Sequence, residues 1–150
     1  MRAEADKAPD DLAVFAAFVQ RAALPVVPGS AKKRLPPEPD ILCRFHSGEA
    51  VAFELTEACA PEFAEAGTKA SKERKGVAFA WGNDVSEKTI AKKLRQTYQV
   101  NGPVELLLYT NGRTALSDEV IKAKIEPLLR EGLGQFRRVW FMGDEISDFS

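Results

Sequence analysis

The sequence predicts an α/β domain in which helices flank both faces of a mixed sheet. A pair of strand patterns at 41–57 indicates a hairpin. The run from Val104 to Thr110 is nearly all apolar, as is typical of a strand covered on both faces. Helical and strand patterns alternate after the hairpin, which favours helices on both sides of the sheet. The chain has 150 residues and no internal repeat, so we expect one domain over 1–150 with its core at about 10–142.

The first expected element is a helix that begins at Asp10 and Asp11, since aspartate suits the N-cap position. Its apolar stripe at helical spacing comprises Leu12, Phe15, Ala16, Val19 and Ala23. Pro25 and the Pro28-Gly29 pair end the helix. Residues 30–39, which contain Lys32, Lys33, Arg34 and three prolines, then form an extended connection.

The two strands of the hairpin are expected at 41–45 and 50–57. Gly48 suits the left-handed position that closes a three-residue loop at 46–48. In this register Asp40 lies opposite Glu54, whereas a two-residue loop would shift Asp40 to the other face. Alternation along the second strand places two sets of side chains on opposite faces, Val51, Phe53 and Leu55 on one and Ala52, Glu54 and Thr56 on the other.

The remaining elements continue the alternation. A short strand at 77–81 is followed by a helix at 86–99, whose inward residues are Ile90, Leu94, Thr97 and Tyr98. The strand at 104–110 comes next, and Ser117 caps a second helix that Pro127 should kink or divide. A last strand at 138–142 precedes an acidic tail. The expected order is therefore α-β-β-(β)-α-β-α-β, where the strand in brackets is that at 77–81.

Composition excludes several classes of protein. A formal net charge of -1 excludes a uniformly basic nucleic-acid binder but allows local basic patches. The longest apolar run, 12–19, is too short to cross a membrane, and acidic residues precede it where a signal peptide would be basic. Two cysteines are too few for a disulfide scaffold or a four-cysteine zinc site. We therefore expect a soluble, cytoplasmic protein.

The carboxylates of Asp40 and Glu54 are the strongest chemical signal in the sequence. Directly opposed residues in an antiparallel pair have Cβ atoms about 4.5–5.5 Å apart. Two carboxylates this close repel each other unless a cation, a proton or a basic group intervenes. An oxygen site for Mg²⁺ or Mn²⁺ is the functional solution. The alternative is a strand-entry aspartate and a structural or solvated glutamate.

The pattern Pro39-Asp40, a hairpin and then Glu54-Leu55-Thr56 resembles the PD-(D/E)xK nuclease superfamily. The order of elements is similar to the core of that superfamily, the restriction-endonuclease-like fold. The resemblance implies that Asp40, Glu54 and the carbonyl of Leu55 hold Mg²⁺ or Mn²⁺. It implies a divalent-metal-dependent nuclease, in which the metal activates water for phosphodiester hydrolysis.

The sequence departs from that family where the motif has its lysine, because Thr56 stands there. Some members of the superfamily carry the basic residue on the following helix. Lys88 and Lys92 lie on one face of the helix expected at 86–99 and are the candidates for this role. The expected catalytic set is therefore Asp40, Glu54, Thr56, Lys88 and Lys92.

A basic cluster before that helix is the candidate contact to DNA or RNA phosphates; it comprises Lys69, Lys72, Arg74 and Lys75. The simpler interpretation of such a cluster is a solvated surface. The loss of the motif lysine leaves a second reading open. In that reading the domain is a catalytically inactive nucleic-acid-binding or protein-interaction module with a nuclease-like fold.

Overall fold

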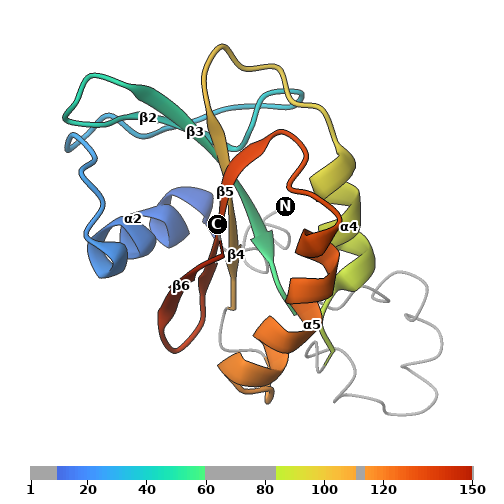
Figure 1. Ribbon diagram of the computed structural model, residues 1–150. Coiled ribbons are helices and arrows are strands. Elements are labelled where there is room, and N and C mark those ends of the chain that lie inside the picture. Colours follow the sequence, from blue (N-terminus) through green and yellow to red (C-terminus); the bar gives the residue numbers. More distant parts are fainter. Residues whose placement is uncertain (1–9, 60–83, 111–113, 150) are drawn as a thin grey trace, which may run out of the picture.

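The computed structural model describes residues 10–59, 84–110 and 114–149 (Figure 1). The strands are β1 (Lys32–Lys33), β2 (Ile41–Arg44), β3 (Ala50–Glu57), β4 (Val104–Tyr109), β5 (Phe136–Met142) and β6 (Ile146–Asp148). The helices in the described residues are α2 (Asp11–Ala22), α4 (Glu87–Arg95) and α5 (Asp118–Arg130). The strands form one six-stranded sheet in sequential order, β1 to β6.

The sheet is mixed, which confirms the predicted α/β class. Strand β3 pairs with β4 and β4 pairs with β5 in parallel, whereas the other neighbouring pairs are antiparallel. Parallel neighbours need a crossover connection, and α4 and α5 lie in the two crossovers. Both helices cover one face of the sheet, and α2 lies against the other (Figure 1).

Helix α2 is held to its face by aromatic packing. The Asp10 side chain caps it by accepting from the backbone N–H of Leu12. The ring of Phe15 lies 4.9 Å from that of Phe53, and the ring of Phe18 lies 5.2 Å from that of Trp140. These contacts set the rotation of the helix and turn Leu12, 38% exposed, away from the core. The predicted stripe was therefore wrong at Leu12, at Ala16, which is also exposed, and at Ala23, which is exposed and lies at the C-cap beyond the helix.

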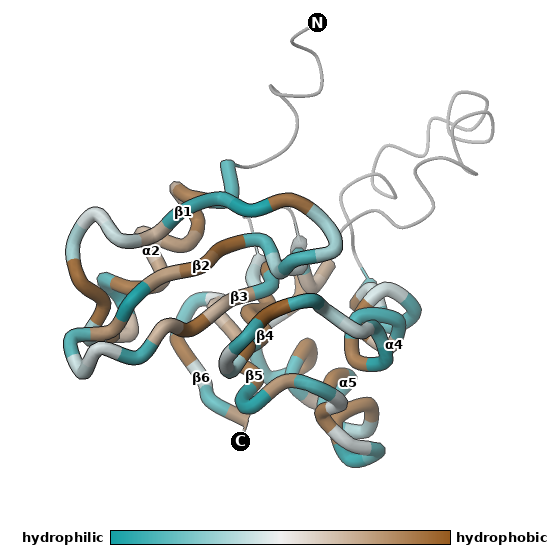
Figure 2. The backbone as a smooth tube through the Cα atoms, turned by 90° about the horizontal axis from the view of Figure 1, so that it is seen from above, coloured by the Kyte–Doolittle hydropathy of each residue, from teal (hydrophilic) through white to brown (hydrophobic). Residues whose placement is uncertain are grey.

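The other face is covered by α4 and α5. Its buried side chains from these helices are Ile90 and Leu94 of α4 and Ile121 and Ile125 of α5. They pack against the side chains that β3, β4 and β5 present to this face of the sheet, which include Ala52, Leu106, Leu108, Val139 and Phe141. In Figure 2 hydrophobic colour follows the central strands, whereas β1 and the outer turns of α4 are hydrophilic.

Several boundaries differ from the prediction. Helix α4 ends at Arg95 because Gln96 is extended. Thr97 and Tyr98 therefore lie in the segment after the helix, where Tyr98 is buried and Thr97 is exposed. Pro127 does not divide α5, which continues to Arg130; it lies in the last turn, where its missing N–H removes one helical hydrogen bond. Strand β5 begins at Phe136, two residues earlier than expected.

The two edge strands were not predicted. The pair Lys32–Lys33 in the expected connection forms β1, and part of the expected acidic tail forms β6. Short, charged segments of this kind carry no alternating pattern and form strands only because they pair with a longer neighbour. The expected strand at 77–81 lies outside the described residues. Within the described part of the chain, no helix is long and apolar enough to cross a membrane.

Candidate metal and nucleic-acid site

The predicted register of the hairpin is confirmed. The Phe45 N–H donates to the Glu49 carbonyl at 2.8 Å, and Gly48 has a φ of 96°. The β2–β3 pairing continues to Ile41 opposite Phe53, so the next pair is Asp40 opposite Glu54. The Asp40 N–H donates to Oε1 of Glu54 at 3.0 Å. The two acidic residues therefore lie together where β2 begins and β3 approaches its end.

Pro39 interrupts the hydrogen-bond ladder of the hairpin. Hydrogen-bonded pairs recur at every second position of an antiparallel ladder, so the Phe45–Glu49 pair predicts one at positions 39 and 55. Proline has no N–H and therefore cannot donate to the Leu55 carbonyl from β2. The Leu55 N–H donates instead to Oδ2 of Asp40, at 3.0 Å. The Leu55 carbonyl is thus left without a donor from β2, beside both carboxylates.

The ammonium group of Lys93 lies at Glu54. Its Nζ is 2.6 Å from Oε2 of Glu54, whose side chain is only 5% exposed. Burial and the neighbouring charge of Asp40 raise the pKa of Glu54, whereas the hydrogen bonds from Lys93 and the Asp40 backbone oppose this rise. A buried carboxylate needs such partners, because an unpaired charge in the interior is costly.

Lys88 and Lys92, the predicted substitutes for the motif lysine, are exposed on α4 and are not the groups that reach Glu54. Sequence reasoning missed Lys93, although a signal for it was present. Three residues after Ile90 and directly before Leu94, it borders the buried stripe of α4, whereas Lys88 and Lys92 lie on the opposite side of the helix.

A second ammonium group, that of Lys33 on β1, lies beside Asp40. Its Nζ is 3.7 Å from Oδ1 of Asp40 and 2.5 Å from Oδ2 of Asp11, in the first turn of α2. Burial lowers the pKa of Lys33, but the hydrogen bonds and charges of Asp11 and Asp40 raise it overall. Each carboxylate of the pair thus has an ammonium partner.

Two buried hydroxyl groups accompany Glu54. Thr56 lies two residues further along the same face of β3, and Tyr98 lies in the segment after α4. Among the described residues neither hydroxyl has a hydrogen-bond partner of good geometry. Burial raises the pKa of Tyr98, and the charges of Glu54 and Asp40 raise it further. The hydroxyl groups of Thr56 and Tyr98 are therefore able to form further hydrogen bonds near Glu54.

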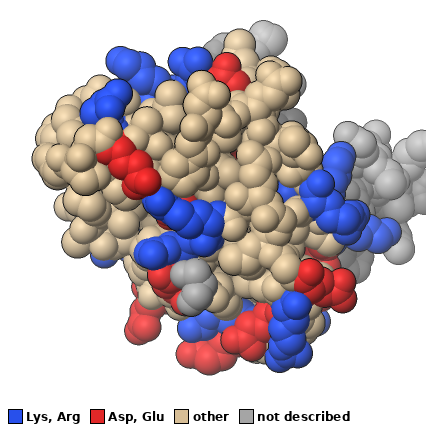
Figure 3. Space-filling model, turned by 45° about the horizontal axis from the view of Figure 1, so that its top comes forward, with Lys and Arg blue, Asp and Glu red and all other residues tan. Residues whose placement is uncertain are grey.

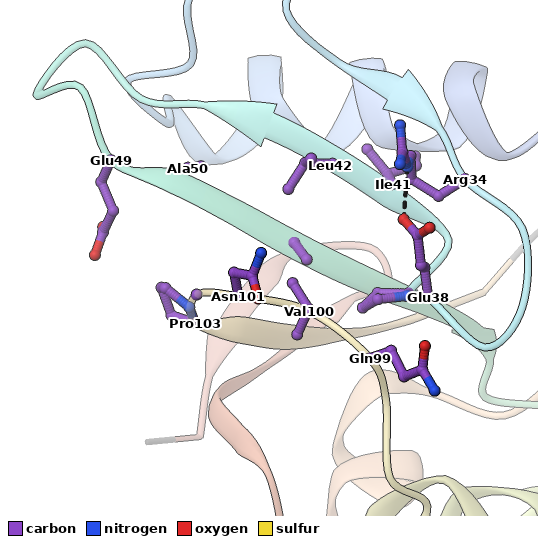
Figure 4. A pocket seen from close by; sticks show the side chains of 13 residues that line it. Arg34, Glu38, Ile41, Leu42, Glu49, Ala50, Gln99, Val100, Asn101 and Pro103 are labelled. Carbon is purple, nitrogen blue, oxygen red and sulfur yellow. Dashed lines mark hydrogen bonds and ion pairs between the residues drawn. The ribbon is translucent and has the colours of Figure 1, made fainter.

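A groove lies along the hairpin (Figure 4). It encloses about 690 Å³ and lies between the segment before β2 and the segment before β4. Its lining includes Pro39, which precedes Asp40, and Ala52, which lies two residues before Glu54, but neither Asp40 nor Glu54 itself. An ion pair of 2.7 Å between Arg34 and Glu38 closes one end of it. The remaining lining is Ile41, Leu42, Glu49, Ala50, Gln99, Val100, Asn101, Gly102 and Pro103.

Basic side chains do not form one continuous patch on the face seen in Figure 3, where described Lys and Arg residues lie in separate groups between acidic ones. The predicted phosphate-binding cluster, Lys69, Lys72, Arg74 and Lys75, lies outside the described residues. In the described part of the molecule, the cations at the acidic pair are Lys33 and Lys93.

A further buried carboxylate, that of Glu105 on β4, faces the side of α2 and is fully engaged. It accepts from the Trp140 indole at 2.7 Å and from Nε and one terminal nitrogen of Arg137 at 2.9 and 2.7 Å. Arg137 also pairs with Glu49 at 3.1 Å. This cluster joins β4, β5 and the hairpin, and it has no open position comparable to that beside Asp40 and Glu54.

The donor set at the acidic pair suits a small divalent cation. Asp40, Glu54 and the Leu55 carbonyl offer only oxygen ligands, which Mg²⁺ and Mn²⁺ prefer. Within the described residues no group of three or more His, Cys, Asp or Glu side chains is placed to hold a metal. Mg²⁺ commonly keeps several waters and binds through one or two carboxylates together with substrate phosphates, and Asp40 and Glu54 are two such carboxylates.

The chain matches no protein-family model, no curated protein and no solved structure.

Proposed function

We propose that the protein is a nuclease of the PD-(D/E)xK type that depends on Mg²⁺ or Mn²⁺ and hydrolyses phosphodiester bonds in DNA or RNA. The observation that carries the proposal is the position of Lys93, 2.6 Å from the carboxylate of Glu54 and opposite Asp40 in the hairpin. An ammonium group from α4 thereby stands in for the motif lysine that Thr56 replaces.

The order of elements supports the proposal. Helix α2, the antiparallel strands β1 to β3, helix α4 and the parallel strand β4 follow one another as in a restriction-endonuclease-like core. Asp40 lies at the start of the middle strand and Glu54 near the end of the next, where this family has its acidic residues. The Leu55 carbonyl, which receives no hydrogen bond from Pro39, would add the backbone ligand.

Each residue of the proposed site has a separate role. Asp40, Glu54 and the Leu55 carbonyl would hold the cation, which supplies Lewis-acid activation of water and charge stabilisation on the phosphate. Lys93 balances the charge of Glu54 and presents N–H donors to an attacking water. The groove lined by Pro39 and Ala52 would take an adjoining part of the substrate.

The test is cleavage of single- and double-stranded DNA and RNA with Mg²⁺ or Mn²⁺ and, as a blank, with a chelator. Glu54→Gln and Lys93→Met should each lower cleavage at least a hundredfold, because they remove a ligand and the charge partner. Lys92→Met is the matched control, since it removes an exposed lysine from the same helix. Equal losses in the two lysine variants would contradict the proposed role of Lys93.

The second candidate is a catalytically inactive nucleic-acid-binding or protein-interaction module with a cytoplasmic location. It is favoured by the finding that both carboxylates already have ammonium partners, Lys33 and Lys93. This candidate predicts salt-dependent nucleic-acid binding that Glu54→Gln leaves unchanged, without any rise in melting temperature on addition of Mn²⁺. The free thiols of Cys43 and Cys59 agree with a reducing compartment.

A further inference from the structure

The ammonium group of Lys33 lies between two carboxylates that belong to different elements. Asp11 is in the first turn of α2, and Asp40 precedes β2. The Nζ of Lys33 is 2.5 Å from Asp11 and 3.7 Å from Asp40. The side chains of Asp11 and Asp40 are each about a quarter exposed, at 24% and 25%, so solvent reaches them and ions can exchange.

Lys33 is placed at the oxygen that a cation would need. Oδ2 of Asp40 already accepts from the Leu55 N–H, whereas Lys33 lies at Oδ1. A divalent cation bound through Oδ1 would therefore meet a positive charge only a few ångströms away. Lys33 does not have to lose its ion pair to make room, because Asp11 is its closer partner.

We propose that Lys33 is a positioning residue that sets the affinity of the acidic pair for divalent cations, and that Asp11 determines how strongly it competes. Lys33 neutralises Asp40 when no cation is bound and stays with Asp11 when one binds. The inference rests on the proposed function, since it concerns the same metal site. It adds a residue from β1 and one from α2 that the nuclease motif does not include.

Two substitutions should change the affinity in opposite directions. Lys33→Met removes the competing charge and should lower the dissociation constant for Mn²⁺ about threefold to tenfold. Asp11→Asn removes one of the two carboxylates beside Lys33 and leaves Asp40 as the other. It should therefore raise the dissociation constant for Mn²⁺ by a similar factor. Asp10 remains as the N-cap of α2, so Asp11→Asn retains the helix cap.

Lys32→Met is the matched control. Lys32 precedes Lys33 in β1, and successive side chains of a strand point to opposite faces. The control changes the net charge by the same amount without removing an ammonium group from Asp40, so the constant should change less than about twofold.

The experiment measures Mn²⁺ binding by the full chain, by electron paramagnetic resonance of free Mn²⁺ and by the rise in melting temperature. Opposite shifts in Lys33→Met and Asp11→Asn, with Lys32→Met unchanged, support the inference. Equal effects of the two lysine variants, or shifts of one sign in Lys33→Met and Asp11→Asn, overturn it. Lys33→Gln replaces Lys33→Met if the latter lowers the melting temperature in chelator.

The outcomes separate this inference from the proposed function. If Glu54→Gln abolishes Mn²⁺ binding but the Lys33 and Asp11 variants bind like the wild type, the metal site stands and the inference is wrong. If the opposite shifts occur but no nucleic acid is cleaved, the inference stands and the nuclease proposal is wrong. If neither the wild type nor any variant binds Mn²⁺, both are wrong.

Discussion

Replacing Lys93 by methionine tests how the buried charge of Glu54 is tolerated. The substitution keeps the apolar length of the side chain and removes its ammonium group. Glu54 would then retain the Asp40 N–H at 3.0 Å but lose the charge partner at 2.6 Å. With a side chain only 5% exposed, the carboxylate has little water to replace that partner.

The magnitude follows from burial on the two sides of the pair. Removing one partner of a fully buried ion pair costs about 3–5 kcal/mol. The Lys93 side chain is 26% exposed, so water enters the space that the ammonium leaves. Glu54 can also take up a proton. We therefore expect Lys93→Met to lower the free energy of unfolding by about 2–3 kcal/mol at pH 8.

The cost should depend on pH with a definite sign. Burial and the charge of Asp40 raise the pKa of Glu54, and removing Lys93 raises it further. A carboxyl group whose pKa is higher in the folded protein binds more protons there than in the unfolded chain. The free energy of unfolding therefore falls as the pH rises from about 4.3, the pKa of a glutamate in the unfolded chain, through the pKa of Glu54 in the folded protein. The cost of Lys93→Met should therefore fall below about 1 kcal/mol at pH 4.5.

Urea unfolding of Lys92→Met and Lys93→Met at pH 4.5 and pH 8 measures how much each substitution lowers the free energy of unfolding. Lys92→Met, on the exposed side of the same helix, should stay within about 0.5 kcal/mol of the wild type at both values. In a Glu54→Gln background Lys93→Met should cost less than about 1 kcal/mol, because no buried charge is left unpaired. Equal costs at the two pH values, or equal costs for Lys92→Met and Lys93→Met, would refute the reasoning.

Three further predictions follow from other parts of the molecule. Arg137→Met leaves Glu105, whose side chain is 4% exposed, with only the Trp140 indole as a partner, so it should lower the free energy of unfolding in urea by about 2 kcal/mol. Glu49→Gln, at the exposed end of the same cluster, should lower it by less than about 0.5 kcal/mol. Gly134→Ala should cost more than about 2 kcal/mol, because its φ is 61° and a Cβ there collides with the Leu94 carbonyl. Gly48→Ala has open space and should cost about 1 kcal/mol; equal melting temperatures for the two alanine variants would contradict this. Thr56→Val removes a buried hydroxyl that has no partner in the described residues, so it should leave stability unchanged or raise it by up to about 1 kcal/mol in thermal unfolding.

The hairpin and its acidic pair were predictable because their information is local. A glycine at the left-handed position fixes the loop length, and the loop length fixes the register that brings Asp40 to Glu54. The two apolar central strands were predictable for a related reason, since strands covered on both faces need apolar side chains throughout. Local rules therefore located the acidic half of the site.

The basic half depends on how α4 is rotated against the sheet. The mutual spacing of Lys88 and Lys92 identifies the outer face of the helix and not the lysine that borders the sheet. At about 100° per residue, Lys93 lies about 80° from the centre of the stripe formed by Ile90 and Leu94, and Lys92 lies nearly opposite that centre. The edge strand that carries Lys33 has no such signal, because two lysines form a strand only through pairing with β2.

The separation of the site residues along the chain has a consequence for its dynamics. Asp40 and Glu54 are 14 residues apart on one hairpin, whereas Lys93 lies 39 residues beyond Glu54 on a nine-residue helix. The acidic pair thus belongs to one hairpin, whereas the charge partner of Glu54 belongs to a separate helix. Local unfolding that undocks α4 would remove Lys93 from Glu54, while Lys33 on β1 would stay beside Asp40. The docking of α4 therefore sets the charge balance at Glu54, and the edge strand β1 sets the charge balance at Asp40.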